Sequence, residues 1–326
     1  MSQKNKINIG IVIPCYKVGK SINAIVDNLV NLKLPDNFFI KYIVIVDDKC
    51  PDNSTKNIHH KLLKNPKVIT LMHKINLGVG GAVKTGYNFL LKKNVNFIIK
   101  IDGDGQMDTK HIKSFVNHAI SGNYSYVKGN RFYNYETIKT MPLTRLLGNA
   151  ILSFLNKISS GYWDIFDPTN GYTLIKKNAL EKLDIDKINN RYFFESDMLF
   201  RLSLIRARVS DFPIQAIYGS EESNLKVYKI IAPFLYLHFK NFIKRFFYLY
   251  FLRDISVASF EFILGLPLFI FGFIYGVHQW NYFSIVGQQA PTGTIILISL
   301  ALIFGVQFLL GFINYDINNN PNKWPQ

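Results

Sequence analysis

The chain has 326 residues, enough for one large domain and a smaller accessory part. Its net charge of +16 suits phosphate-bearing partners or an anionic membrane face, whereas the dispersed basic residues and the lack of a recognition motif argue against nucleic acid. Cys15 and Cys50 lie outside any CxxC or zinc spacing, which predicts reduced thiols in the cytosol.

The front part of the chain predicts strands that alternate with helices. Strands are expected at Ile7–Pro14, Tyr42–Val46, Val68–Leu71 and Phe97–Ile101, and helices at Ser21–Leu32, Lys56–Leu63 and Gly81–Leu91. This alternation predicts an α/β domain with a mostly parallel sheet, whose ligands bind at the carboxyl ends of the strands. The N-terminus lacks the apolar segment of a signal peptide, so this domain is expected to stay in the cytosol.

Acidic clusters follow two of these strands. The carboxylates of Asp102 and Asp104, in the segment DGDGQ, can approach one divalent ion. Hard oxygen ligands favour Mg²⁺ or Mn²⁺, which neutralises a nucleoside-diphosphate leaving group. Asp47 and Asp48 end the Tyr42–Val46 strand, where acidic groups accept hydrogen bonds from a base edge or from ribose hydroxyls. Two adjacent carboxylates have no structural need for each other, which favours a binding role.

A glycine-rich segment, Asn76–Gly86, enters the predicted Gly81–Leu91 helix. It matches neither the Walker pattern GxxxxGK[ST] nor GxGxxG, which argues against a P-loop ATPase and a standard dinucleotide fold. Its small residues, with Lys84 nearby, fit the close passage of a nucleotide, so Lys84 is a candidate contact to a nucleotide sugar.

The segment Lys226–Asp254 predicts amphipathic helices at a membrane surface, with cations that face lipid phosphates. Its basic residues lie among Phe, Tyr and Leu, and they are Lys226, Lys229, Lys240, Lys244, Arg245 and Arg253.

From Phe262 to Tyr315 the chain has no Lys, Arg, Asp or Glu. Phe262–Val277 and Ile295–Ile313 are therefore predicted to cross a membrane, and the basic residues before the first span place that side in the cytoplasm. A buried helical hairpin of a soluble protein is the alternative. Glycines in the first span, Gly265, Gly272 and Gly276, are expected to let spans pack closely.

Taken in order, these motifs resemble the inverting glycosyltransferase family 2, which has the GT-A fold. The resemblance rests on IVIPCYK at Ile11–Lys17, VDDKCPD at Val46–Asp52, NLGVGGAVKTG at Asn76–Gly86 and DGDGQMD at Asp102–Asp108. With the two-span tail, the chain is most similar to the polyprenol-phosphate sugar synthases of that family. This resemblance implies a nucleotide-sugar donor, with UDP favoured over GDP, polyprenyl (undecaprenyl) phosphate as acceptor, and assembly as a dimer or tetramer.

The resemblance also implies the donor site. Pro14, Tyr16 and Asp48 would line the base and ribose, with Asp47 beside them. The metal and the donor diphosphate would be held by Asp102, Asp104 and Gln106.

For the acceptor side, the resemblance implies a phosphate clamp and catalytic carboxylates. Arg131, Arg145 and Lys226 would face the acceptor phosphate, although Arg131 also fits an ion pair with an acid. The residues nearest the reaction would be Arg131, Asp167, Glu195 and Asp197. Asp167 also fits a tight turn, and Glu195 or Asp197 also fits a helix cap.

The expected organisation is a GT-A domain at 1–225, amphipathic juxtamembrane helices at 226–258, a two-helix transmembrane hairpin at 259–316 and a cytoplasmic tail at 317–326. This predicts a multi-pass protein of the inner (plasma) membrane with a cytoplasmic catalytic domain.

Several acceptors and functions compete. Polyprenyl phosphate is already anionic near neutral pH, because its second pKa is about 6. A lipid-diphosphate-linked oligosaccharide is the alternative acceptor, and its hydroxyl would need Glu195 or Asp197 as a base. The absence of QxxRW argues against a processive polysaccharide synthase, the intact DGDGQ segment against a non-catalytic scaffold, and the small number of spans against a transporter.

Overall fold

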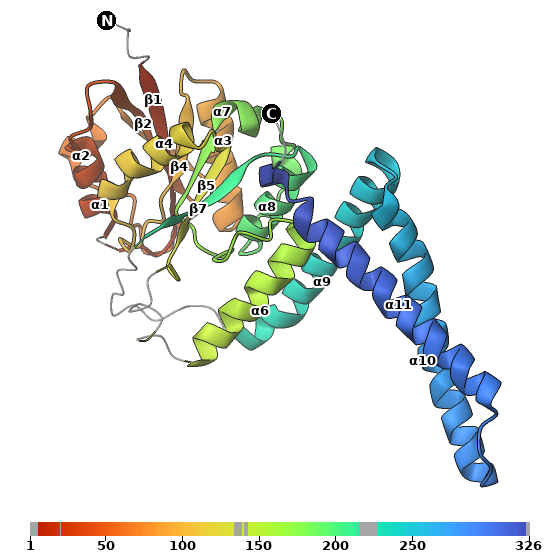
Figure 1. The fold of residues 1–326 in the computed structure, drawn as a ribbon. Coiled ribbons are helices and arrows are strands. Elements are labelled where there is room, and N and C mark those ends of the chain that lie inside the picture. The colour runs from red at the N-terminus through yellow and green to blue at the C-terminus, as the bar shows by residue number, and fades with distance from the viewer. Residues whose placement is uncertain (1–5, 20, 134–138, 140–142, 215–226, 324–326) are drawn as a thin grey trace, which may run out of the picture. The chain divides into compact units, whose positions relative to one another are not determined.

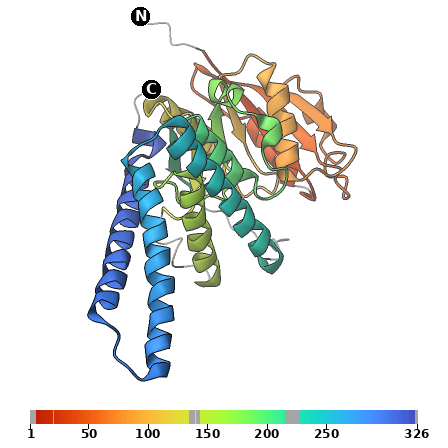
Figure 2. The same cartoon turned by 90° about the vertical axis from the view of Figure 1, so that its right-hand side faces the viewer.

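The computed structural model describes residues 6–19, 21–133, 139, 143–214 and 227–323 (Figures 1 and 2). The chain divides into two compact units, Met1–Phe242 and Ile243–Gln326. The first unit contains a sheet with its covering helices, and the second contains two long apolar helices.

A seven-stranded sheet, in the order β3-β2-β1-β4-β6-β5-β7, forms the centre of the first unit. The β1–β2, β2–β3, β1–β4 and β5–β7 pairs are parallel, whereas β6 runs antiparallel to both β4 and β5. The predicted mostly parallel sheet is therefore confirmed. The strands are β1 (Ile7–Cys15), β2 (Phe38–Asp47), β3 (Val68–Met72), β4 (Phe97–Lys100), β5 (Tyr126–Asn130), β6 (Thr173–Lys176) and β7 (Val209–Pro213).

Helices cover both faces of this sheet (Figure 1). Successive β1 side chains point to opposite faces, so Ile11 joins a core with α1 and α4, while Val12 joins a second core with α3 and α8. A strand buried on both faces needs apolar residues throughout, which explains its continuous apolar run. The helices of this unit are α1 (Ser21–Val30), α2 (His60–Leu63), α3 (Val79–Leu91), α4 (Ile112–Ser121), α6 (Leu143–Ser160), α7 (Lys177–Glu181), α8 (Phe194–Leu204) and most of α9 (Val227–Phe247).

One predicted helix is much shorter than expected. The Lys56–Leu63 prediction corresponds only to α2. The residues before α2 form turns instead, because the Asp52 carboxylate accepts a hydrogen bond from the Ser54 backbone N–H at 3.0 Å and Asn53 has φ of +54°. Such local side-chain bonds compete with a helix.

The second unit contains α10 (Val257–Val286) and α11 (Thr292–Asn318). Both are long and apolar enough to cross a membrane, with mean hydropathies of 2.1 and 2.6 in their most apolar windows. Only 22% and 17% of those windows is buried within the protein, unlike the mostly buried core helix of a soluble protein. Helix α10 continues beyond the predicted span Phe262–Val277 and includes the residues His278–Tyr282.

Glycines permit a close contact between α10 and α11. A Cβ at Gly265 would lie 2.8 Å from the Phe308 Cβ, and one at Gly305 would lie 2.6 Å from the Phe269 backbone nitrogen. Cβ atoms at Gly272 and Gly276 would each lie 3.0 Å from side-chain atoms of α11. The prediction that glycines of the first span allow close helix packing is confirmed.

One cation of the predicted membrane surface is not available to lipid. Arg245 is buried, and its guanidinium donates to the Asp316 carboxylate at 2.7 and 3.0 Å. The Tyr250 hydroxyl also donates to Asp316. The expectation that Arg245 faces lipid phosphates is therefore wrong, since a bidentate partner at the far end of α11 neutralises it. Lys240 and Lys244 are exposed, as expected.

Candidate active site

A buried lysine links the acidic loop to α8. Lys100, the last residue of β4, is 1% exposed. Its ammonium lies 2.7 Å from Asp102 Oδ1 and 2.9 Å from Glu195 Oε1, and it donates to the Gly171 carbonyl at 3.2 Å. Burial alone lowers the pKa of Lys100, but the two carboxylates outweigh it and raise the pKa above its ordinary value. Lys100 therefore stays charged and holds both acids in place.

This lysine was not predicted as a site residue. The available signal was a charged side chain within the buried strand FIIK, immediately before an acidic loop. A buried lysine is rare without a charged partner.

The antiparallel strand β6 brings a second segment to the same edge. Lys100 is paired with Thr173, so the residues that precede β6 lie beside the carboxyl end of β4. A larger residue at Gly171 would displace the ion pair of Lys100 and Asp102, because a Cβ would lie 2.1 Å from Asp102 Oδ2 and 2.5 Å from the Lys100 ammonium. The motif Asp167–Tyr172 is thus brought to the acidic loop by sheet pairing.

The loop after β4 carries the candidate metal ligands. The Asp102 side chain is 29% exposed, and Asp104 and Gln106 are half-buried. Asp104 Oδ1 accepts the Gln106 backbone N–H at 3.0 Å, which fixes the turn. Within the described ranges no three His, Cys, Asp or Glu residues gather as a metal site. Two carboxylates still fit Mg²⁺ or Mn²⁺ in donor chemistry, because Mg²⁺ in proteins is often held by one or two carboxylates, substrate phosphates and water.

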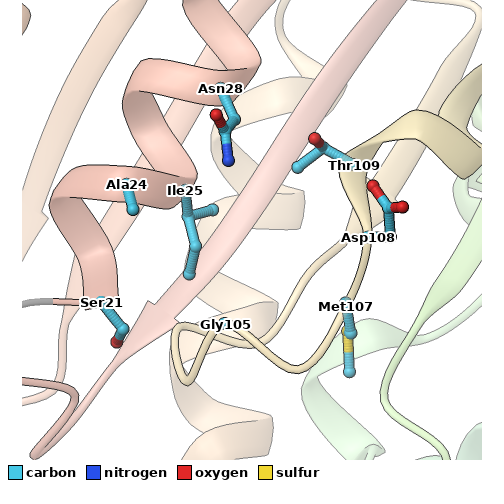
Figure 3. Close-up of a pocket in the computed structure, with 8 residues that line it drawn as sticks. All are labelled: Ser21, Ala24, Ile25, Asn28, Gly105, Met107, Asp108 and Thr109. Atoms are coloured by element: carbon cyan, nitrogen blue, oxygen red, sulfur yellow. The ribbon is translucent and has the colours of Figure 1, made fainter. Parts of the chain in front are cut away.

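A pocket lies behind this loop, between α1 and Gly105–Thr109 (Figure 3). Its lining includes Ser21, whose hydroxyl donates to the Gly103 carbonyl at 2.6 Å and so anchors the acidic loop to α1. None of the predicted site residues lines this pocket. We therefore infer that the residues around this pocket support the acidic loop and that the pocket is not the substrate site.

Arg131 and Asp167 form a bidentate ion pair. The Arg131 Nε and a terminal guanidinium nitrogen donate to the two carboxylate oxygens of Asp167 at 2.8 and 3.0 Å. Burial favours a raised pKa for Asp167, but the Arg131 hydrogen bonds and the charges of Arg131 and Lys128 hold the pKa below its ordinary value. A carboxylate in this setting is a weak base. The structure thus pairs two residues that were both predicted to lie near the reaction.

The acids at the start of α8 point to different partners. Glu195 faces Lys100, whereas Asp197 accepts hydrogen bonds from the Asn189 backbone N–H at 2.9 Å and the Asn241 amide at 3.0 Å. Asp197 is also 3.2 Å from the Arg201 Nε. Neither acid is the N-cap of α8, which begins after Phe193 without a side-chain cap. Of the two, only Glu195 joins the acidic loop.

The adjacent carboxylates after β2 each have structural partners. Asp48 accepts backbone N–H groups of Leu77 and Gly78, both at 2.7 Å, and lies 2.8 Å from the His73 Nδ1. Asp47 accepts the Cys50 backbone N–H at 2.7 Å. The premise that these acids have no structural need is therefore wrong: Asp48 fixes the glycine-rich segment and Asp47 fixes the following turn. Contact of either with a nucleotide stays a prediction.

The glycines of that segment approach the protein's own backbone. A Cβ at Gly78, whose φ is +91°, would lie 2.6 Å from the Asn190 carbonyl oxygen, and one at Gly80 would lie 2.3 Å from that of Asn189. The Lys84 ammonium donates to the Asp186 and Ile188 carbonyls at 2.9 and 3.0 Å and to the Asn190 amide oxygen at 2.7 Å. Lys84 therefore holds this loop, and its nucleotide contact stays a prediction.

The remaining predicted residues differ in how far the structure describes them. Pro14 is buried in β1, and Tyr16 just beyond it is 45% exposed at the carboxyl edge of the sheet. Arg145 lies in the first turn of α6, but its side chain is outside the described part of the protein. Lys226 lies outside the described residues.

Comparison with known proteins adds a family and a fold. The model of "Glycosyl transferase family 2" matches residues 10–184. The chain is 32% identical over 227 residues to the UDP-N-acetylglucosamine–dolichyl-phosphate N-acetylglucosaminyltransferase of Methanococcus voltae, covering 64% of this chain and 86% of that protein. It is 24% identical over 193 residues to the polyprenol monophosphomannose synthase of Mycolicibacterium smegmatis, covering 59% and 70%.

A solved structure supports the fold alone. The glucosyl-3-phosphoglycerate synthase of Mycobacterium tuberculosis, in complex with Mn²⁺, UDP and phosphoglyceric acid, aligns with a TM-score of 0.52 at 11% identity. The alignment covers 73% of this chain and 78% of that one. The first unit therefore has a GT-A-like fold.

Proposed function

Because this chain belongs to glycosyl transferase family 2 and is a glycosyltransferase, we propose that it transfers a sugar from a nucleotide sugar to polyprenyl phosphate. The single observation that carries the proposal is the cluster at the carboxyl edge of the sheet, where Asp102, Lys100 and Glu195 meet, in a chain that also carries two helices long and apolar enough to cross a membrane. The activities of the dolichyl-phosphate and polyprenol relatives support this acceptor class.

The donor side of the reaction requires stabilisation of a departing nucleoside diphosphate. Asp102 and Asp104, with Gln106, would hold Mg²⁺ or Mn²⁺, which when bound would neutralise charge on the diphosphate. The exposed Tyr16 ring would contact the base, and Pro14, Asp47 and Asp48 would shape the wall beside the ribose. UDP is favoured over GDP, because one relative uses a UDP-sugar and the similar fold is solved with UDP.

A phosphate acceptor explains why the carboxylates near the site are paired. Asp167 is bound by Arg131, Glu195 by Lys100 and Asp197 by Arg201, so none is placed as an unoccupied base. An anionic phosphate oxygen needs no general base, since its second pKa is about 6. Arg131, whose side chain is 21% exposed, would orient that phosphate, with Arg145 and Lys226 as further candidates. A single displacement would invert the anomeric centre.

The lipid-diphosphate-linked oligosaccharide is the less favoured acceptor. Its attacking hydroxyl has a pKa far above neutral and needs a base within hydrogen-bond reach. The pairing of Glu195 and Asp197 with cations argues against that role. We place the catalytic unit at the cytoplasmic face of a plasma membrane, because its donor is a cytosolic metabolite and its cations precede the apolar helices.

A transfer assay tests the proposal. The full chain in detergent is incubated with either polyprenyl phosphate or a lipid-diphosphate-linked sugar, together with Mn²⁺ or Mg²⁺ and radiolabelled UDP- or GDP-sugars. Label is followed into the organic phase. We expect mild-acid-labile lipid label, reduced about 10²–10³-fold in Asp104→Asn, because loss of one group that stabilises charge in the transition state costs this much. Transfer only to a lipid-diphosphate-linked sugar would refute the phosphate acceptor and support the alternative.

A further inference from the structure

Helix α6 has its polar residues inside and its apolar residues outside. The buried face carries Ser153, Asn156, Ser159 and Ser160, which are 1%, 0%, 1% and 0% exposed. The opposite face carries Leu143, Leu147, Ile151 and Phe154, which are 67%, 55%, 60% and 56% exposed. These four residues are spaced by three and four positions, so they form one stripe along the helix. We call this stripe the outer face of α6.

The inward polar face is built into the protein. The Ser159 hydroxyl lies 2.8 Å from His238 Nδ1 of α9, and the Ser160 hydroxyl donates to the Asn156 carbonyl at 2.6 Å. The His238 ring packs against Phe193 with centroids 4.8 Å apart. A rotation of the helix to bury its apolar side would break the contact between Ser159 and His238. The exposure of the outer face is therefore fixed by the fold.

Helix α9 repeats this arrangement within the first unit. His238 and Asn241 are buried, and the Asn241 amide donates to Asp197 at 3.0 Å. Leu235 and Phe239 are 45% and 63% exposed. Both views show α6 and α9 side by side and extending away from the sheet (Figures 1 and 2). Two neighbouring helices thus turn apolar side chains outward.

The surrounding solvent decides which arrangement is stable. In water, a helix buries its apolar stripe and exposes polar residues. In lipid the preference reverses, because polar groups find partners inside the protein and apolar groups meet the acyl chains. A helix with an apolar face at the headgroup boundary is the interfacial form of this arrangement. The outer face of α6 fits that environment.

We propose that the outer face of α6 lies in the headgroup–acyl boundary of an anionic lipid bilayer. The occupant is argued from the same chain, which carries two helices long and apolar enough to cross a membrane. Helix α9 also runs without a break through Phe242, where the first unit ends, into Ile243 of the second. Helix α6 contains no Asp or Glu, so no carboxylate within it would repel anionic headgroups.

This contact would couple the bilayer to the active site. Helix α6 is about 27 Å long at 1.5 Å per residue. Its last residue, Ser160, is followed by the segment that leads to Asp167, the partner of Arg131. A bilayer that fixes α6 would fix the start of that segment. The proposal concerns the surface alone and holds for any sugar or lipid acceptor.

Site-specific fluorescence on the full chain tests the proposal. Ile151→Cys is labelled with an environment-sensitive fluorophore and reconstituted in nanodiscs of phosphatidylcholine and phosphatidylglycerol. Ser114→Cys, on an exposed position of α4, is the matched control. The wild type provides the labelling background, because Cys15 and Cys50 are both buried. Quenching by lipid-borne doxyl groups is compared with quenching by aqueous iodide. Phe154→Cys repeats the measurement if the first variant does not fold.

We expect the label at position 151 to be quenched at least twofold more by lipid-borne doxyl, and at least twofold less by iodide, than the label at position 114. Equal iodide quenching at the two positions would overturn the proposal, because the outer face would then lie in water. Shielding from both quenchers, with cross-linking between two copies through position 151, would also overturn it and assign the face to a protein interface.

Discussion

Replacing Lys100 with methionine tests whether one buried cation organises the active site. The substitution keeps an unbranched apolar stem of four heavy atoms but removes the terminal ammonium. Asp102 Oδ1 then loses a partner at 2.7 Å and Glu195 Oε1 one at 2.9 Å. The Gly171 carbonyl loses its donor as well.

The expected cost follows from the burial of these groups. Removing one partner of a buried ion pair costs about 3–5 kcal/mol, because the remaining charge is left without compensation. The Glu195 side chain is 9% exposed and cannot recover its hydration, whereas Asp102 at 29% can. We therefore expect about 3 kcal/mol, the lower end of that range. For a domain of this size, this lowers the melting temperature by about 6–12 °C.

Thermal unfolding of the full chain in detergent, followed by intrinsic fluorescence, measures this loss. Lys113→Met, at an exposed position of α4, is the matched control and should change stability by less than about 0.5 kcal/mol. The double variant Lys100→Met/Glu195→Gln should lose less than the sum of its single variants, with a coupling of about 0.5–3 kcal/mol. If Lys100→Met melts within about 2 °C of the wild type, the ammonium does not carry the stabilisation assigned to it.

Three further predictions test other parts of the structure. Burial lowers the pKa of Lys128 from 10.5 to about 8, so the unfolded chain retains this proton at higher pH than the folded chain does. The free energy of unfolding of the wild type should therefore rise by about 3 kcal/mol relative to that of Lys128→Met as pH rises from about 8 to about 10.5. If the two proteins show the same pH dependence of this free energy across that range, the lowered pKa of Lys128 is contradicted. Gly305→Ala should lower stability by about 1–3 kcal/mol through overpacking, because its Cβ would lie 2.6 Å from a backbone nitrogen. Gly148→Ala is the control: its Cβ meets open space, so the melting temperature should stay unchanged or rise. Gly171→Ala should lower sugar transfer while the protein still folds, because its Cβ would lie 2.1 Å from Asp102 Oδ2 and would displace that carboxylate. Unchanged activity would contradict this expectation.

Much of the fold could be predicted from local patterns. The apolar run of β1 and the periodicity of α1 identify a strand and a helix from neighbouring residues alone. The acidic loop after β4 was placed correctly, since it follows directly from the end of a strand. By contrast, β6 is four residues long and was not predicted, because its burial depends on strands β4 and β5 on either side.

The site required contacts that no local pattern contains. Arg131 and Asp167 were each identified, but their pairing depends on a sheet that brings together the end of β5 and the segment before β6. Lys100 and Glu195 are separated by 95 positions in the chain. Lys84 lies near a glycine-rich segment in sequence, yet it binds a loop more than a hundred positions away. Sequence spacing therefore identified residue types but not their partners.

The sequence by itself determined the elements whose cause is local: the alternating strands and helices, the acidic loop at a strand end, and the apolar helices α10 and α11. Only the tertiary structure decided which charges are neutralised and which faces are covered. Arg245 was expected at a lipid surface and is instead paired with Asp316. Helix α6 has an amphipathic pattern, but that pattern does not state which face is inward. The physical reason is that burial and charge pairing are set by neighbours distant in sequence, and here they turn the polar face of α6 inward.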